Sequence, residues 1–247
     1  MKLIQLNIWQ GILMYQAARF LKEERPDILN LQEVTTGVGD SDSYLFSVLE
    51  KLKRDFPQLR NRYFQHSLSS RYFGKKVYLG NMILSRYRIS GKKSVFTEGK
   101  PEENVLLGKE SHGVCFLQHT RMETPAGVVN DLNYHGYWVP TGKTGNATTL
   151  RHCRMIADYI ESIDKDEKII LTGDFNLSPH SRSMEILNKR LTNLVIKHGI
   201  KTTRPPIRDT RTPVDFILVN GRVRVRSFRV PMNAIVSDHL PLILNFG

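Results

Sequence analysis

Polar residues able to take part in catalysis stand at the ends of apolar segments that are far apart in the sequence. In layered α/β proteins, ligands bind at strand ends, because a rigid sheet there feeds loops that can aim side chains. We therefore expect these residues to meet at one site, although each alone is also typical of a turn or a helix cap. They are Asn7, Glu33, His135, Asp174, Asn176, Asp215 and the pair Asp238-His239.

Three of these residues offer oxygen ligands for a metal ion. Glu33 and Asp238 carry carboxylates, and Asn7 carries a neutral amide oxygen. Such hard ligands suit Mg²⁺ or Mn²⁺ and suit zinc poorly, and magnesium often takes only one or two carboxylates beside waters and a substrate phosphate. The set predicts a Mg²⁺ or Mn²⁺ site.

The remaining groups could act on a phosphate bound beside that ion. Asp174 could orient or deprotonate an attacking water, while His135 and His239 could face the phosphate and stabilise developing charge. Asp215 could fix the tautomer of His239 and raise its basicity. Together these residue types predict metal-assisted hydrolysis of a phosphate ester.

Two of these segments also have a purely structural explanation. The GDFN segment around Asp174 could form only an Asx-type turn. Asp238 and His239 are sequence neighbours, and neighbours on a strand point to opposite faces of a sheet. Both side chains can therefore reach one site only if the chain turns at Ser237-Asp238.

Strands dominate the elements that must position these residues, and helices fall between some of them. This favours a layered α/β protein with mixed sheets, and residues 1–247 contain no repeat or linker that would divide them into more than one domain. The apolar patterns predict helices near 13–25, 44–56, 148–163 and 180–189. They predict strands at 3–8, 28–31, 77–84, 114–118, 128–134, 169–172, 216–219, 223–230 and 240–246.

Composition narrows the class of protein further. The formal net charge of +12 raises the expectation of a polyanionic partner such as nucleic acid. Two cysteines exclude a disulfide-built scaffold and a four-cysteine zinc site. There is no apolar run of membrane-spanning or secretory type, so the expected setting is cytoplasmic, with a monomer as the default. The segment Gly142-Lys143-Thr144-Gly145 lacks the spacing of a phosphate-binding P-loop and is interpreted as a flexible loop.

The sequence resembles the endonuclease/exonuclease/phosphatase superfamily, whose members have the DNase I-like fold. The resemblance implies a four-layered α/β sandwich in which two mixed sheets pack face to face with helices outside. It also implies a divalent-metal phosphoesterase with its site at one end of the sandwich. It rests on short segments that follow in order from residue 7 to residue 241: LNIW, LQEV, GNMILSR, NYH, LTGDFN, VDFILV and SDHLP.

The resemblance also implies roles for individual residues. Glu33 would be the main metal ligand with Asn7 and Asp238 nearby, and Asp174 would align or activate the water. Asn176 and His135 would hold the phosphate, and Asn81 would support the site. His239, oriented by Asp215, would stabilise the pentacovalent state or act as general acid.

The sequence says less about the substrate. Abasic-site nucleases of the superfamily typically have Tyr at the position of His135, and a Trp shortly before the final Asp-His pair, where this chain has PMNAIV. Both departures argue against that activity. A nuclease acting on DNA or RNA is the leading prediction; alternatives are an enzyme acting on a small or lipid-linked phosphate ester and a nucleic-acid-binding protein without turnover.

Basic residues give the only hint toward nucleic acid. Arg204, Arg208 and Arg211 lie in a Pro-containing loop ahead of Asp215 and are candidate phosphate-binding residues. A second group alternates with aromatic residues between positions 60 and 76, a mixture that suits phosphates and stacked bases but is also typical of a solvated loop. It comprises Arg60, Arg62, Arg71, Lys75 and Lys76 with Tyr63, Phe64, Tyr72 and Phe73.

Overall fold

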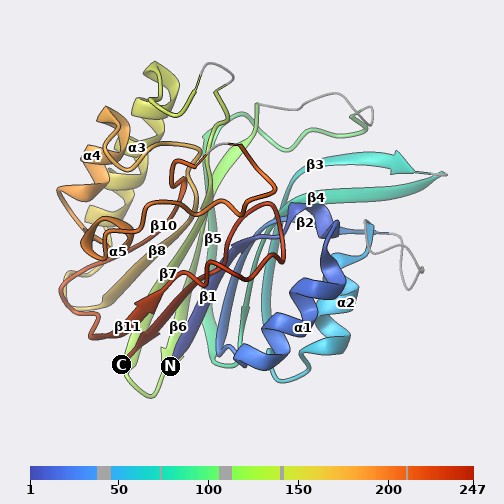
Figure 1. Cartoon of the computed structure of the whole chain (residues 1–247), viewed down its shortest axis with the longest axis horizontal. Helices are drawn as coiled ribbons and strands as arrows, with labels where there is room; N and C mark the ends of the chain where they lie inside the picture. Colours follow the sequence, from blue (N-terminus) through green and yellow to red (C-terminus); the bar gives the residue numbers. More distant parts are fainter. Residues whose placement is uncertain (38–45, 73, 106–112, 140–141, 210) are drawn as a thin grey trace.

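In the computed structural model, two mixed β-sheets pack face to face and helices cover their outer faces (Figure 1). The structure describes residues 1–37, 46–72, 74–105, 113–139, 142–209 and 211–247. This is the predicted four-layered DNase I-like sandwich. Within the described ranges, no helix is long and apolar enough to cross a membrane.

Each sheet has six strands within the described part of the chain. The first has the order β11 (Val225–Arg229), β12 (Leu242–Phe246), β1 (Lys2–Asn7), β2 (Ile28–Thr36), β4 (Lys75–Ser85), β3 (Asn61–Tyr72). The second has the order β5 (Arg88–Glu98), β6 (Cys115–Thr124), β7 (Gly127–His135), β8 (Lys168–Asp174), β10 (Asp215–Val219), β9 (Thr192–Asn193). In each sheet one central pair is parallel, β1 with β2 and β7 with β8, so the carboxyl ends of these strands lie at one edge.

Helices α1 (Met14–Glu24) and α2 (Val48–Asp55) cover the outer face of the first sheet, after the short 3₁₀ helix η1 (Trp9–Gly11). Helix α1 ends at Glu24; its C-cap residue, Arg25, has left-handed backbone angles and is followed by Pro26, a residue that cannot continue a helix. Helices α3 (Ala147–Glu161), α4 (Arg182–Asn188) and α5 (Leu194–Lys197) lie against the second sheet. An Asn146 capping box starts α3, because its side chain accepts a hydrogen bond from the Thr149 N–H.

The alternation of side chains along β1 shows how one strand serves two layers. Ile4 and Leu6 belong to the apolar cluster under α1 and α2, whereas Leu3 and Gln5 face the opposite sheet. Since successive side chains of a strand point to opposite faces, Asn7 continues the row that faces the second sheet. The apolar pattern of β1 thus fixes the direction in which its last residue points.

A layer of buried amide and carboxyl side chains joins the two sheets. Gln32 Nε2 donates to Asn133 Oδ1 at 2.6 Å, and Asn30 Nδ2 donates to Asp131 Oδ1 at 2.7 Å. All four residues are fully buried. Buried polar groups are tolerated when hydrogen-bonded, so these contacts fix how the sheets stack.

Several elements differ from the sequence-based expectations. The basic and aromatic stretch near residues 60–76 is not a solvated loop; most of it forms β3 and the start of β4, a hairpin that extends beyond the sandwich (Figure 1). Phe73 and the first residues of the predicted helix 44–56 lie outside the described residues. Strand β5 was not predicted, because its burial is intermittent and its sequence mixes charged and apolar residues.

Candidate active site

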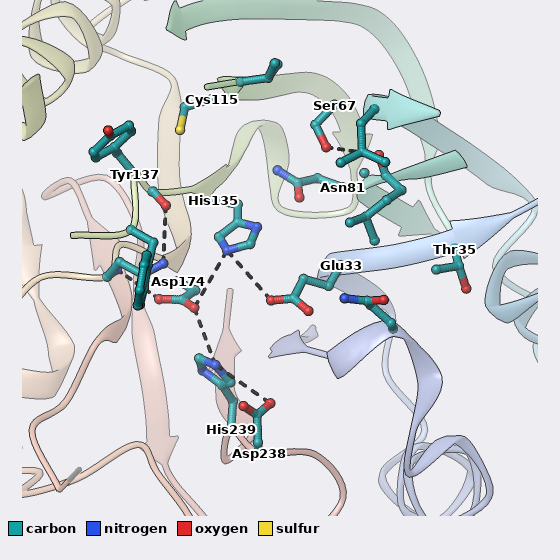
Figure 2. A pocket seen from close by; sticks show the side chains of 18 of the residues that line it. Glu33, Thr35, Ser67, Asn81, Cys115, His135, Tyr137, Asp174, Asp238 and His239 are labelled. Carbon is teal, nitrogen blue, oxygen red and sulfur yellow. Dashed lines mark hydrogen bonds and ion pairs between the residues drawn. The ribbon is translucent and has the colours of Figure 1, made fainter. Parts of the chain in front are cut away.

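Strand topology brings the predicted polar residues to one edge of the sandwich. In the second sheet, Asp174 lies in register with His135 on one side and with Asp215 on the other. In the first sheet, Asn7 is the last residue of β1 and lies in register with Gln32 of β2. Figure 2 shows Glu33, His135, Asp174, Asp238 and His239 pointing into a common space. The structure therefore brings these strand ends together.

Glu33 does not close a strand; it sits at an irregularity within β2. The register of β2 against β4 shifts between Leu31 and Val34, and Glu33 has a backbone φ of 56°. A bulge of this kind re-aims a side chain toward a site, and a non-glycine residue in the left-handed region stores local strain. The Glu33 carboxylate is held by Asn7, whose Nδ2 donates to Glu33 Oε1 at 2.9 Å.

His239 lies between two carboxylates. Its Nδ1 is 2.9 Å from both oxygens of Asp215, and its Nε2 is 3.4 Å from Asp174 Oδ2. Burial alone would lower the pKa of His239, but the charges of Asp215 and Asp174 outweigh burial and raise the pKa above its ordinary value. Asp238-His239 precedes β12 in a turn, as two side chains directed to one site require.

Asp215 is held in place by groups outside the active site. Thr203 Oγ1 donates to Asp215 Oδ2 at 2.7 Å, and Gln5 Nε2 lies 3.3 Å from Asp215 Oδ1. Two segments far apart in the sequence therefore orient this carboxylate toward His239, and one of them, through Gln5, belongs to the buried polar layer. Sequence analysis did not single out Gln5 or Thr203, although a Gln inside an otherwise apolar strand was a visible signal.

Asp174 both forms the Asx-type turn considered in the sequence analysis and lines the site. Its Oδ1 accepts a hydrogen bond from the Asn176 backbone N–H at 2.9 Å, which is an Asx-type turn, while Oδ2 faces His239 and His135. Burial would raise the pKa of Asp174, but the nearby charges of His239, His135, Arg204 and Lys143 lower it to about 2. The carboxylate is therefore ionised at neutral pH and can accept a proton or orient a water.

Asp238 is paired with two arginines. Its Oδ2 lies 2.6 Å from Arg208 Nη2 and 3.3 Å from Arg204 Nη1. The Arg208 guanidinium also stacks 5.1 Å from the centre of the Trp9 ring, a cation–π arrangement. Of the three predicted phosphate-binding arginines, Arg204 and Arg208 line the site, and Arg211 is not among the described residues that do.

Glu33, His135, Asp174, Asp238 and His239 lie on the wall of a cavity of about 850 Å³. The Lys and Arg residues that line it within the described ranges are Lys143, Arg204 and Arg208, and the imidazoles of His135 and His239 line it as well. Asn81, on β4, faces the same space (Figure 2). Away from the carboxylates, the wall combines polar side chains such as Ser67 and Ser70 with a group of apolar ones, which are Phe46, Leu68, Val77, Leu79, Val105 and Val114.

The oxygen donors fit a hard divalent cation best around Glu33. The Glu33 side chain is 22% exposed toward the cavity, and within the described part of the chain only its Oε1 has a hydrogen-bond donor, which leaves Oε2 for an ion. Asp238 has only Oδ1 left, because Oδ2 is engaged by the arginines. The ligand atoms of Asp174, Asp215 and His239 lie within 4.8 Å of one another, but hydrogen bonding between His239 and Asp215 accounts for that proximity.

The model of the Endonuclease/Exonuclease/phosphatase family matches residues 5–239, so the chain belongs to this family. Its members are generally hydrolytic phosphoesterases that use divalent metal ions. No curated protein matches the sequence.

Solved structures share the fold at low sequence identity. A family member from Bacteroides vulgatus is 18% identical with a TM-score of 0.72, and the alignment covers 100% of this chain and 98% of that one. A mannosyl-6-phosphatase from Bacteroides thetaiotaomicron is 16% identical, with a TM-score of 0.69 and coverage of 100% and 99%. Truncated TDP2 from Caenorhabditis elegans is 17% identical, with a TM-score of 0.63 and coverage of 99% and 96%.

Proposed function

We propose that this protein is a Mg²⁺- or Mn²⁺-dependent phosphoesterase, and that nucleic acid is its first candidate substrate. The main support for this reaction is the buried His239–Asp215 pair. His239 Nε2 lies 3.4 Å from Oδ2 of the ionised Asp174 carboxylate, which is on the cavity wall. A proton donor and a proton acceptor held side by side suit hydrolysis, because the attacking water must lose a proton and the leaving oxygen must be stabilised.

In this proposal each residue has a defined task. Asp174 orients the attacking water and accepts its proton, while His239, whose pKa is raised by the Asp215 carboxylate, donates a hydrogen bond or a proton to the phosphate. His135 and Asn176 contact the phosphoryl oxygens. A divalent cation, when bound, neutralises the phosphoryl oxygens. Glu33 would be its principal ligand and Asp238 Oδ1 a second one. Asn7, whose Oδ1 accepts a hydrogen bond from the Trp9 N–H and whose Nδ2 donates to Glu33, would hold the Glu33 carboxylate in place beside the ion.

Nucleic acid is the candidate favoured by charge. The net charge of +12 suits a polyanion, and basic side chains occur on the β3–β4 hairpin that extends from the sandwich (Figure 1). Arg71 and Lys75 near its tip are described and exposed, and each strand of a bound duplex would present phosphates at regular spacing to such a projection. The affinity for nucleic acid is expected to fall steeply as the salt concentration rises.

A small phosphate ester is the second candidate, and it is favoured by the cavity. The wall opposite the carboxylates has apolar side chains, such as Leu68, Val77 and Val114, instead of the cations that flanking phosphates would require. The printed name of one similar structure, a mannosyl-6-phosphatase, supports a small substrate as well. Affinity for such an ester should change little with salt.

The deciding experiment is cleavage of end-labelled single- and double-stranded DNA and RNA with Mg²⁺, beside a panel of small phosphate esters. EDTA and His239→Ala are expected to abolish turnover of the true substrate. His180→Ala is the matched control, because this exposed histidine lies outside the cavity. Turnover that survives both EDTA and His239→Ala would identify a contaminant, and failure on every compound would refute the proposed reaction.

A second measurement separates an enzyme from a binding protein. With Asp174→Ala, an enzyme loses turnover and keeps its fold, whereas a protein that only binds polyanions keeps or improves its affinity. Glu33→Gln should weaken the rise in melting temperature that Mg²⁺ produces in the wild-type protein, since ligands that bind the native state stabilise it. An identical Mg²⁺ response in both proteins would remove Glu33 from the metal site.

A further inference from the structure

Lys143 places an ammonium group on the cavity wall, and this group has no role in the reaction proposed above. Its Nζ donates to Asn176 Oδ1 at 2.7 Å, and the residue is partly buried and lines the cavity. Asn176 is itself tied to Asp174 and, through Nδ2, to the Gly136 carbonyl at 3.2 Å. The lysine is therefore one hydrogen bond away from a residue proposed to contact phosphate.

The segment that carries Lys143 is fixed at the described positions. The Lys143 carbonyl accepts a hydrogen bond from the Ser178 N–H at 2.7 Å, so the segment is joined to the chain that follows Asp174. Gly145 has a φ of 83°, and a Cβ there would lie 2.7 Å from Thr149 Oγ1. Asn146 then caps α3. Within this loop, both the side chain and the carbonyl of Lys143 are held by hydrogen bonds.

Lys143 differs from the two arginines because it has no carboxylate partner among the described residues. Arg204 and Arg208 both contact Asp238, which neutralises part of their charge. No carboxylate of the described residues lies within ion-pair distance of Lys143 Nζ, and Asn176 Oδ1 is its one hydrogen-bond acceptor among those residues. An ammonium has three N–H donors, so donors remain for a ligand.

A partly buried cation without a counter-ion is unfavourable until an anion arrives. Burial lowers the pKa of Lys143, and the charge of Asp174 only partly offsets this effect. A phosphoryl oxygen bound between Nζ and the Asn176 amide would supply the missing negative charge. Because Lys143, Asn176 and Asp174 are linked, such an oxygen would belong to the same phosphate that Asp174 and His239 address.

On these grounds we propose that Lys143 is a phosphate-binding residue of the active site, which contacts a non-bridging oxygen of the scissile phosphoryl group. The proposal rests on the proposed phosphoesterase function and adds a cation to its substrate-binding set. A charge-assisted hydrogen bond of this kind should change phosphate affinity by about tenfold or more.

The test uses inorganic phosphate as the probe, with binding measured calorimetrically on the full chain with and without Mg²⁺. Lys143→Met should weaken phosphate binding by about tenfold or more, and Lys143→Arg should retain most of it. Lys165→Met is the matched control, because Lys165 is exposed and outside the cavity, and its affinity should equal that of the wild type.

Lys143→Gln separates phosphate binding from a purely structural role. Glutamine keeps an N–H donor for Asn176 but has no charge, so a structural lysine would leave phosphate affinity unchanged in this variant, while a phosphate-binding lysine would not. It also serves if Lys143→Met fails to fold. Wild-type affinity in Lys143→Gln or a folded Lys143→Met, or no phosphate binding by the wild type, overturns the proposal.

Failure of the proposed function can be distinguished from failure of the Lys143 proposal. If no nucleic acid or phosphate ester is hydrolysed by the wild type, the reaction is refuted, yet the phosphate-binding comparison still decides the role of Lys143. If a substrate is found, Lys143→Met should raise KM or lower kcat/KM at least as much as it weakens phosphate binding. Unchanged kcat/KM in that variant would overturn the inference while leaving the phosphoesterase intact.

Discussion

Asp131 is a carboxyl group fully buried between the two sheets, and its replacement by Asn should stabilise the protein at alkaline pH. Its Oδ1 accepts a hydrogen bond from Asn30 Nδ2, but within the described part of the chain neither its Oδ2 nor Asn30 Oδ1 has a hydrogen-bond partner. Burial raises the pKa of Asp131 from an ordinary value of 3.8 to about 7, although the Asn30 hydrogen bond opposes the rise. A proton on Oδ2 would supply the layer with a donor that it lacks.

The direction of the pH dependence follows from this raised pKa. Between about pH 4 and pH 7 the unfolded chain has lost the proton and the folded protein keeps it, so the folded state binds more protons and stability falls as pH rises. Above pH 7 the full cost of the buried charge is present. The difference between 3.8 and about 7 corresponds to about 4 kcal/mol.

Asp131→Asn replaces the carboxylate with a neutral amide of similar shape. The variant should be more stable than the wild type at pH 8, by up to about 4 kcal/mol, with the advantage shrinking by about 1.4 kcal/mol per pH unit below pH 7. Urea unfolding at pH 5 and pH 8 measures both quantities. Asp158→Asn, on the exposed face of α3, is the matched control and should show no such difference.

A wild-type-to-variant difference that is the same at pH 5 and pH 8 would refute this reasoning. It would mean that Asp131 has the same charge in the folded protein at both values. A variant that is less stable at both values would mean that the carboxylate makes contacts which the amide cannot replace.

Two further predictions concern the site and the strand that carries it. Asp215→Asn should lower kcat by about 10²–10⁴-fold with the fold retained, because the tautomer and charge of His239 are no longer fixed; the pH dependence of kcat should also shift toward acid, and an unchanged profile would contradict the His239–Asp215 pairing. Gly173→Ala should destabilise the protein by at least about 2 kcal/mol in urea unfolding, since Gly173 has a φ of 147° and a Cβ there would lie 1.9 Å from the Tyr134 carbonyl oxygen; Gly221→Ala, where the space is open, is the control and should be near neutral.

Local sequence pattern was sufficient for the elements that are well buried along most of their length or along one helix face. Strands β1, β7, β8 and β10 and helix α3 lie close to their predicted ranges, because short apolar runs and helical spacing report burial directly. Strands β3 and β5 carry interleaved charged and aromatic residues and are only half-buried, so the same patterns were silent or misleading there.

The chemistry of the site could also be predicted from the sequence, because residue types such as Asp174 and His239 at strand ends limit the reactions that the site could catalyse. Their meeting required the parallel pairing of β7 with β8 and the position of β10 beside them, which are long-range contacts that no local pattern contains. Strand ends become neighbours only when the sheets form.

Only the tertiary structure decided which charges are already neutralised. Asp238 is paired with Arg204 and Arg208, which precede it in the chain by about thirty residues, and Gln5 reaches Asp215 across the sandwich. Lys143 contacts Asn176 and has no carboxylate partner among the residues that the structure describes. The sequence by itself determined the types and the order of these groups. Their electrostatics depended on burial and on distances of a few ångströms, which exist only after the two sheets have packed together.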